Sequence, residues 1–528
     1  MRSLENFSKN ATRDYLQSVV FVDDHIFDHK IGIAALPPAE LPPRKPILAG
    51  GSASGTSRSS QVETEVDAPQ QPYHPKDLVS SFAREGITCA LYEPPEDFPT
   101  APESEIFKLC ERPDIIILDW DFSGDDGAKA LDLIAGLVKQ SAREFPHHTR
   151  LISIYTADQS LVAVANKIAD RLKAEDLSVS PEGAQCRLTS GATRLLVLGK
   201  PIGRFGEEDE QFTVKESRLA KKLIEEFAGM NCGILPSYAL HGLAAIRKNS
   251  KRILDRFHGE LDGAFLLHRA LVSASEEAFD QLPELLAEEI RAVVEDERLS
   301  ASMAKSITAA ALKSNHISDK DRELVLRSHR GEKPKSIADG LKQGGPVLTG
   351  HLRLAALFSS RTQYSSVARK LGFGTVVRYR AKNSKNRATP WKYAVCLVPA
   401  CDSLRLKPDQ TAQFAFWTID LETYNGSMPR SGMAFPTDGE AHIALSASGK
   451  AGDKLWTDSF TVDRRSRTVV AVRSKKRYRY QGCKRTIEWL GQLKPLHAHR
   501  IAHGITDHLS RVGVTEAEWL RLLCTRSH

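Results

Sequence analysis

The chain has 528 residues, which is too many for one hydrophobic core, so two to four domains are expected. Its 41% hydrophobic and 26% charged residues are typical of globular proteins, and the net charge of +7 is mild for this size. No apolar run approaches the roughly 18 to 20 residues of a membrane helix, and the first residues lack the apolar core of a signal peptide. The eight cysteines form no C-x-x-C pair, which argues against a zinc site or a disulfide framework and predicts a cytoplasmic protein.

The first 230 residues alternate between short apolar runs and amphipathic segments, which predicts a doubly wound α/β domain with a five-stranded parallel sheet. A stretch rich in Pro, Gly and Ser, about residues 30–75, is expected to be a long disordered insertion in this domain. The predicted strands are 16–24, 87–94, 114–120, 150–157 and 193–201, and the predicted helices are 75–86, 103–112, 127–145, 160–176 and 214–229.

Residues 231–345 show apolar positions three and four apart, which predicts a helical bundle or linker. A helix pair that forms a homodimer fits the same pattern, and the spacing does not separate the two. Residues 346–528 are expected to form a β-rich module with helices at its end. The predicted strands of this module are 374–381, 391–400, 413–422, 441–448, 459–465 and 468–474, and its predicted helices are 488–513 and 515–524.

Residues 115–127, "IIILDWDFSGDDG", bring several carboxylates to the end of a predicted buried strand. Three other predicted strands also end in polar residues, namely Asp23 with Asp24, Thr156 and Lys200. Ligands of parallel α/β sheets bind at the carboxyl ends of the strands, so these side chains are expected to converge with Asp119. Clustered carboxylates suit a hard cation such as Mg²⁺, and the lysine and threonine suit an anionic group beside it.

The order and spacing of these residues resemble the receiver domains of bacterial response regulators, over roughly residues 14–230. The segment "LDWDFSGDDG" resembles the signature around the family's phosphoacceptor aspartate. The other matching positions are the acidic pair Asp23 and Asp24, the pair Thr156 and Ala157, and the pair Lys200 and Pro201.

The resemblance implies a role for each position. Asp119 would be the phosphoacceptor, and Asp24 and Asp119 would ligate Mg²⁺ through carboxylate oxygens. Asp23 would act through a water and Asp121 through its backbone carbonyl. Thr156, Ala157 and Lys200 would hold the phosphoryl group, and Asp126 and Gly127 would shape the turn after the strand. No hydrolase or oxidoreductase motif is evident, so phosphoryl transfer to Asp119 is the only chemistry expected.

Three departures from the family pattern support an alternative, a pseudo-receiver that docks a partner without phosphotransfer. The long insertion follows Asp24 directly, and residues 179–194 expand the connection before the fifth strand. Val197 stands where the family often has an aromatic switch residue.

A second candidate site is the basic stretch 464–485, which contains ten Lys or Arg residues and no acid. On a strand, the arginines would share one face and the tyrosines the other, so the cations could bind phosphates and the rings could stack on bases. A solvated strand face and a surface for an acidic partner protein fit equally. The candidate nucleic-acid-binding residues are Lys475, Lys476, Arg477 and Arg479.

The whole chain resembles bacterial proteins in which an atypical response receiver domain precedes a helical and β-rich region. Besides the receiver residues, the segments 240–271 and 393–406 carry this resemblance. Such proteins are often encoded in predicted defence or conflict gene clusters beside an ATPase of the histidine-kinase-like (GHKL) type. The resemblance therefore implies such an ATPase as the partner.

Overall fold

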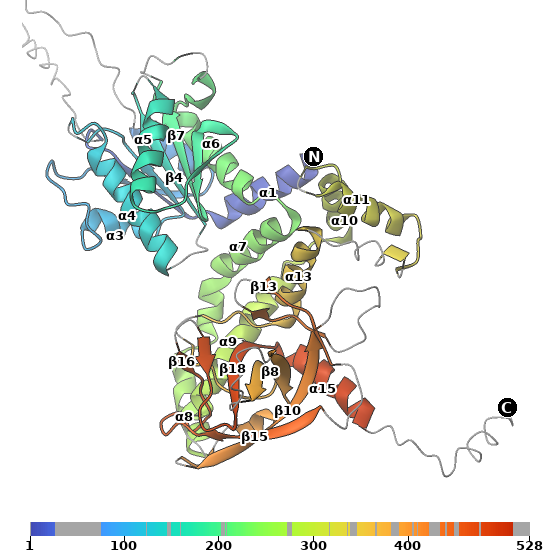
Figure 1. Cartoon of the computed structure of the whole chain (residues 1–528). Helices are drawn as coiled ribbons and strands as arrows, with labels where there is room; N and C mark the ends of the chain where they lie inside the picture. The colour runs from blue at the N-terminus through green and yellow to red at the C-terminus, as the bar shows by residue number, and fades with distance from the viewer. Residues whose placement is uncertain are drawn as a thin grey trace, which may run out of the picture. The chain divides into compact units, whose positions relative to one another are not determined.

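The chain forms two compact units, Met1–His316 and Ile317–His528, in a computed structural model (Figure 1). Within the residues that the structure describes, no helix is both long and apolar enough to cross a membrane. The described residues are 2–26, 75–122, 124–144, 149–158, 160–201, 206, 209–271, 277–315, 317–334, 336–337, 346–364, 367–381, 390–403, 406–408, 410–421, 433–438, 441–447, 454–474 and 477–509. The predicted insertion therefore lies almost entirely outside them.

The first unit is built on a seven-stranded mixed sheet with the order β2-β1-β3-β4-β7-β6-β5. The five predicted strands are present and pair in parallel, and their residues are mostly apolar because helices cover both faces. Their bounds are β1 Ser18–Val22, β2 Thr88–Tyr92, β3 Ile115–Leu118, β4 Arg150–Thr156 and β7 Thr193–Gly199.

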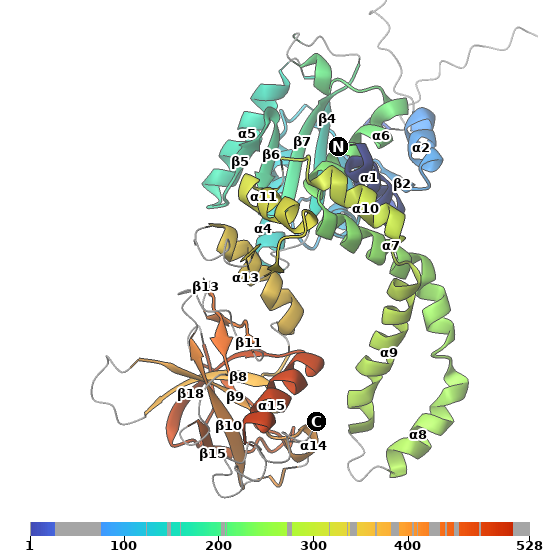
Figure 2. The ribbon, with the colours of Figure 1, turned by 90° about the vertical axis from the view of Figure 1, so that its right-hand side faces the viewer.

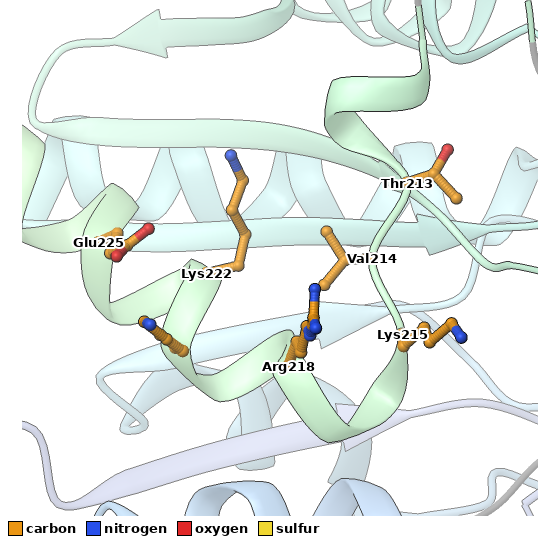
Figure 3. Close-up of a pocket in the computed structure, with 7 residues that line it drawn as sticks. Thr213, Val214, Lys215, Arg218, Lys222 and Glu225 are labelled. Carbon is orange, nitrogen blue, oxygen red and sulfur yellow. The ribbon is translucent and has the colours of Figure 1, made fainter.

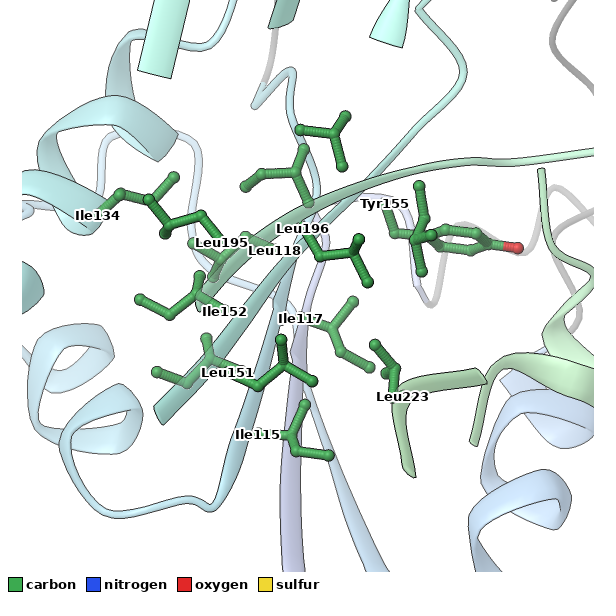
Figure 4. Close-up of a cluster of buried hydrophobic side chains, with 14 of the residues drawn as sticks. Ile115, Ile117, Leu118, Ile134, Leu151, Ile152, Tyr155, Leu195, Leu196 and Leu223 are labelled. Atoms are coloured by element: carbon green, nitrogen blue, oxygen red, sulfur yellow. The ribbon is translucent and has the colours of Figure 1, made fainter. Parts of the chain in front are cut away.

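Five helices cover this sheet, with α3, α4 and α5 on one face and α2 and α6 on the other (Figures 1 and 2). Ile134 of α4 and Leu223 of α6 lie on opposite sides of the central strands in the hydrophobic core (Figure 4). Serine side chains cap two of the helices, Ser104 before α3 and Ser160 before α5. The bounds are α2 Pro75–Arg84, α3 Glu105–Glu111, α4 Ala128–Glu144, α5 Leu161–Ala174 and α6 Glu216–Met230.

The prediction of a five-stranded, all-parallel sheet was wrong in its count and direction. The segment expected to be a long connection forms β5 (Ser180–Glu182) and β6 (Ala184–Ser190), which extend the sheet in antiparallel fashion beyond β7. Arg187 of β6 donates to both carboxylate oxygens of Glu226 on α6, at 2.8 and 2.7 Å. Arg194 of β7 donates to the Glu226 carbonyl at 2.7 Å. This buried ion cluster fastens the added strands to α6.

An N-terminal helix that the sequence did not predict, α1 (Arg2–Tyr15), packs on α6, α7 (Ile234–Asp255) and α10 (Ala301–Ala311). The Ser8 hydroxyl donates to the Ala228 carbonyl at 3.1 Å. Arg247 donates to the Tyr15 carbonyl at 2.6 Å and pairs with Asp114 at 3.0 Å, so α7 is held to both α1 and the base of β3. Between α7 and α10 the chain forms η2 Gly259–Leu261, α8 Asp262–Leu271 and α9 Glu277–Asp296.

The second unit confirms the predicted β-rich module. Its main sheet has the order β11-β14-β10-β9-β8-β18-β17-β16, with β15 paired to β10. One predicted helix was misplaced, because residues 485–492 form β18 and the helix α15 begins only at Pro495. The predicted helix 515–524 lies outside the described residues.

The elements of the second unit pack around two clusters of buried apolar side chains. The strands are β8 Thr375–Ala381, β9 Lys392–Cys396, β10 Thr411–Leu421, β11 Met433–Ala434, β12 Thr437–Asp438, β13 Ala441–His442, β14 Leu445–Ser446, β15 Leu455–Thr461, β16 Val472–Ser474, β17 Arg477–Arg479 and β18 Arg485–Gln492. The helices are α11 Asp319–His329, α13 Pro346–Ser359, α14 Ala400–Ser403 and α15 Pro495–Leu509.

Candidate functional site

The polar residues at the strand ends meet at one edge of the first sheet. Val22 is in register with Leu118, Leu118 with Ile154, and Thr156 with Gly199, so β1, β3, β4 and β7 end side by side. The strand order reverses between β1 and β3, which is where ligands of open α/β sheets bind. Asp23 and Asp119 are the first residues after those two strands, so the fold places them on either side of the switch point.

Lys200 joins the two aspartates. Its Nζ lies 2.9 Å from Asp23 Oδ2 and 3.1 Å from Asp119 Oδ1. All three side chains are nearly buried, with 12%, 3% and 10% of the side-chain surface of Lys200, Asp23 and Asp119 exposed. The ammonium group therefore neutralises part of a negative charge that would otherwise be costly in this buried position.

Burial raises the pKa of Asp119 to about 7, and the negative charge of Asp23 adds to the rise, while Lys200 and the Trp120 amide oppose it. The Trp120 amide donates to Asp119 Oδ1 at 2.8 Å. The carboxyl is thus poised to respond to any positive charge that enters the site.

The carboxylate groups of Asp23, Asp24 and Asp119 have oxygen atoms within 4.8 Å of one another. Three converging carboxylates are the donor set that a hard divalent cation prefers, so these residues fit Mg²⁺. The Asp121 carboxylate is not part of this group; it is exposed and accepts the Asp126 amide at 3.0 Å. The predicted role of the Asp121 backbone carbonyl stays a prediction.

Thr156 ends β4 beside Lys200, whose amide donates to the Thr156 carbonyl at 2.6 Å. The Thr156 side chain is buried, and its hydroxyl oxygen accepts the Asp158 amide at 3.0 Å. This hydrogen bond orients the hydroxyl and leaves its proton available for donation. Ala157, the small neighbour, is exposed at the rim of the site.

Comparison with known families assigns this part of the chain. Residues 15–205 match the family described as the response receiver domain. This part of the chain is a response receiver domain. No curated protein and no solved structure gives a significant match to the chain. The family match covers the sheet and the carboxylate cluster and ends before α6.

The loop after β3 in the receiver domain uses its other acids for structure. Asp125 accepts amides from Phe122, Gly127 and Lys129 at 3.2, 2.9 and 2.8 Å, so it closes the turn and caps α4. Asp126, in a left-handed conformation with φ of 52°, pairs with Lys167 at 2.7 Å. These two acids are therefore not metal ligands in this arrangement.

Two residues of the site were not predicted from the sequence. The His25 amide donates to Asp23 Oδ1 at 2.9 Å, and the His25 imidazole lies 3.9 Å from Asp24. The Trp120 ring is buried under Gly127 and Lys167, whose Nζ lies 5.6 Å from the ring centroid. Both residues adjoin a predicted acid in the sequence, but only the fold shows that they pack against the site.

Tyr155 connects the site to the opposite face of the sheet. Its hydroxyl donates to the Val214 carbonyl at 2.7 Å, and burial raises its pKa, so it stays protonated. Val214 lines a hollow of about 340 Å³ at the start of α6, where Lys215, Arg218 and Lys222 gather (Figure 3). Tyr155 thus joins Thr156, its neighbour in sequence, to a basic surface of the receiver domain.

The predicted nucleic-acid-binding residues lie in the second unit. Lys475 and Lys476 fall outside the described residues. Arg477 pairs with Asp438 at 2.8 Å and Arg479 with Glu488 at 2.7 Å. Tyr480 is buried in the core, so it is not available for stacking on a base. Arg477 and Arg479 are therefore paired with acids and Tyr480 is covered, while binding of nucleic acid by this stretch stays a prediction.

Proposed function

We propose that the receiver domain is a phosphoacceptor in which Asp119 takes up a phosphoryl group with the help of Mg²⁺. The observation that carries the proposal is the position of Lys200, 3.1 Å from Asp119 within a cluster of three carboxylates. A lysine held between two buried acids provides the positive charge that a phosphoryl group needs when it arrives.

The hydrogen bonds of Asp119 favour Oδ2 as the oxygen that attacks phosphorus. Oδ1 accepts from Trp120 and Lys200, whereas Oδ2 accepts no hydrogen bond within the described part of the chain. In the proposed step Oδ2 attacks phosphorus, the new O–P bond forms, and the donor's bond to phosphorus breaks with its electron pair leaving on the donor. Lys200 and the Thr156 hydroxyl then stabilise the phosphoryl oxygens.

A bound Mg²⁺ would neutralise charge on the transferred group. Asp24 and Asp119 are the candidate direct ligands, and Asp23 and the Asp121 carbonyl are the candidate supporting ones. The chain's own contribution is to hold these oxygens in place through Lys200 and the His25 amide.

The proposed output is control of the second unit or of a partner protein. The link from Thr156 through Tyr155 to the basic hollow at α6 is a route by which the state of the site can reach a surface. The partner we propose is a GHKL-type ATPase, in a bacterial defence system, acting with this chain in the cytoplasm. The free state of all seven described cysteines is compatible with that compartment.

The test is the mass of the intact protein after incubation with acetyl phosphate, with and without Mg²⁺. We expect the wild type to gain one phosphoryl group only with Mg²⁺, and Asp119→Asn to gain none. Asp121→Asn is the matched control, because its side chain lies outside the carboxylate cluster, and it should still be labelled.

The second candidate is a pseudo-receiver that docks its partner without phosphotransfer. Labelling that is absent from the wild type, or that persists in Asp119→Asn, would reject the phosphoacceptor. If the wild type is not labelled yet a purified GHKL-type ATPase binds wild type and Asp119→Asn equally, the docking function holds.

A further inference from the structure

A cavity of about 740 Å³ lies in the second unit, between the end of α13, the segment that follows it, and strands β17 and β18. Cavities of about 300 to 1,000 Å³ are the usual size of small-ligand sites in proteins. No role for this cavity follows from the receiver domain, which lies in the other unit.

The charged residues that line the cavity are all basic. Four arginines line it, namely Arg353, Arg361, Arg369 and Arg477, and none of the described lining residues is acidic. Arg353 and Arg361 are exposed, and no described carboxylate lies within ion-pair distance of either. These two guanidinium groups are therefore available to an anion.

Aromatic rings form another part of the wall. Tyr478 and Trp489 lie edge to face at 6.2 Å between centroids, and both are partly exposed. The Arg369 guanidinium lies 4.6 Å from the Tyr478 centroid and 5.4 Å from the Trp489 centroid. Arg369 is itself 7% exposed and donates to the Tyr364 carbonyl at 2.8 Å, so the stack is built into the fold.

We propose that this cavity binds a nucleotide, with its phosphate on Arg353 and Arg361 and its base against the Tyr478 and Trp489 rings. Guanidinium groups hold phosphate oxygens in bidentate geometry, and aromatic side chains and stacked arginines bind planar bases. An acidic peptide would satisfy the arginines but would leave the rings unused. The nucleotide is either free or one unit of a single strand, since both present the same chemistry.

This inference concerns the second unit alone and does not depend on phosphorylation of Asp119. It also differs from the surface predicted from the basic stretch 464–485. The fold turns Tyr478 toward a cavity whose free cations come from residues more than a hundred positions earlier in the chain.

The test measures binding of the full-length chain to a short fluorescein-labelled single-stranded oligonucleotide by fluorescence anisotropy, with ATP as competitor. Binding that ATP abolishes identifies a free nucleotide as the ligand, and binding that resists ATP identifies a strand. Fluorescein-labelled ATP, titrated in the same way, is the second probe. Binding of either probe supports the proposal, and the absence of binding of both would overturn it.

The variant Arg353→Glu/Arg361→Glu should weaken binding by about tenfold or more and flatten its salt dependence. The control Arg465→Glu/Arg500→Glu makes the same charge change at exposed arginines that do not line the cavity, and it should stay within about threefold of wild type. Equal losses of affinity in the two variants would show that the oligonucleotide is attracted nonspecifically by positive charge, and this would overturn the proposed site.

Two further probes separate the base from the charge without changing the protein. An abasic oligonucleotide of the same length keeps the phosphates and should bind about tenfold more weakly, because it has no base to stack. Poly-glutamate should compete weakly. An abasic strand or poly-glutamate that binds as tightly as the normal oligonucleotide would reject a nucleotide site.

Discussion

Gly127, in the loop beside the site, has no room for a side chain. Its φ is +86°, and a Cβ there would lie 2.3 Å from two atoms of the buried Trp120 ring. Trp120 follows Asp119 directly and donates its amide to that carboxylate, so displacing the ring would disturb the proposed phosphoacceptor.

We therefore expect Gly127→Ala to lower the free energy of unfolding by about 3 kcal/mol, measured by urea denaturation. Gly124→Ala is the matched control, because Gly124 has a similar φ of +79° but nothing within 4 Å of its Cβ position. The control should lose only the backbone contribution of about 1 kcal/mol. Equal losses would show that the Trp120 contact carries no energy.

The ionised carboxylate of Asp119 should lower the stability of the fold when no cation is bound. Its pKa in the folded chain is raised to about 7 from an ordinary value of 3.8, so ionisation destabilises the folded state as the pH rises through about 7. Asp119→Asn removes that ionisation. With a chelator present we expect the variant to be more stable than the wild type by about 2 kcal/mol near pH 8.

The difference should shrink toward about pH 5, where Asp119 is mostly protonated in the folded state. Thermal unfolding at the two pH values measures it. Asp121→Asn should match the wild type at both pH values, because its carboxylate is exposed outside the cluster. A variant that is less stable than the wild type near pH 8 would contradict the argument.

At the scale of elements, the two added strands depend on one buried acid. Glu226 of α6 binds Arg187 of β6, and Lys222 lies 3.2 Å from it. Burial alone would raise the pKa of Glu226, but the hydrogen bonds and charges of Arg187 and Lys222 outweigh it, and the pKa is lowered. The pair therefore stabilises the fold above the ordinary pKa of 4.5, and this contribution is lost as the pH falls through the lowered pKa.

Glu226→Gln should lower the free energy of unfolding by about 2 to 3 kcal/mol near pH 7, because Arg187 keeps its charge and loses its partner. The deficit should narrow as the pH falls below about 4. The neighbouring variant Glu225→Gln removes a half-exposed pair with Lys9 and should cost less than about 0.5 kcal/mol. A deficit that is the same at both pH values would show that ionisation of Glu226 is not its cause.

The elements that sequence reasoning predicted are those whose apolar residues are continuous. Runs such as Ile115–Leu118 are buried on both faces of a parallel sheet, and this leaves a clear pattern. The added strand β6 has only alternate residues buried, with Cys186 and Leu188 facing inward, so its signal is weaker. The segment containing Trp489 and Leu490 lies within the predicted helix 488–513, but it forms a strand because it pairs with β8.

The residues of the candidate site also divide into those that the sequence predicts and those that it does not. Each strand-end residue was found from its position alone, since the register of a parallel sheet brings such ends together. The capping role of Asp125 and the packing of Trp120 were not, because both depend on the path of the loop. The cavity at Arg353 and Trp489 joins residues distant in sequence, which no local pattern reveals.

At the scale of the molecule, each unit has its own apolar core, so we expect residues 1–316 to fold alone and to unfold in one transition. A fragment that ends at Met230 keeps the receiver sheet but loses α7, which buries Leu240, Ala244 and Ala245. We expect this shorter fragment to melt at least about 5 °C below fragment 1–316 in circular dichroism. Equal melting temperatures would show that the receiver domain ends before α7, as the sequence predicted.

The packing of α1 also bears on the order of events during synthesis. This helix leaves the ribosome before α6, α7 and α10, on which it packs, because these begin only at residues 216, 234 and 301. Its apolar face, which includes Leu4 and Phe7, therefore stays uncovered while more than two hundred further residues are synthesised. The nascent receiver sheet can form in the meantime, but the apolar face of α1 stays a binding site for chaperones until α6, α7 and α10 have been made.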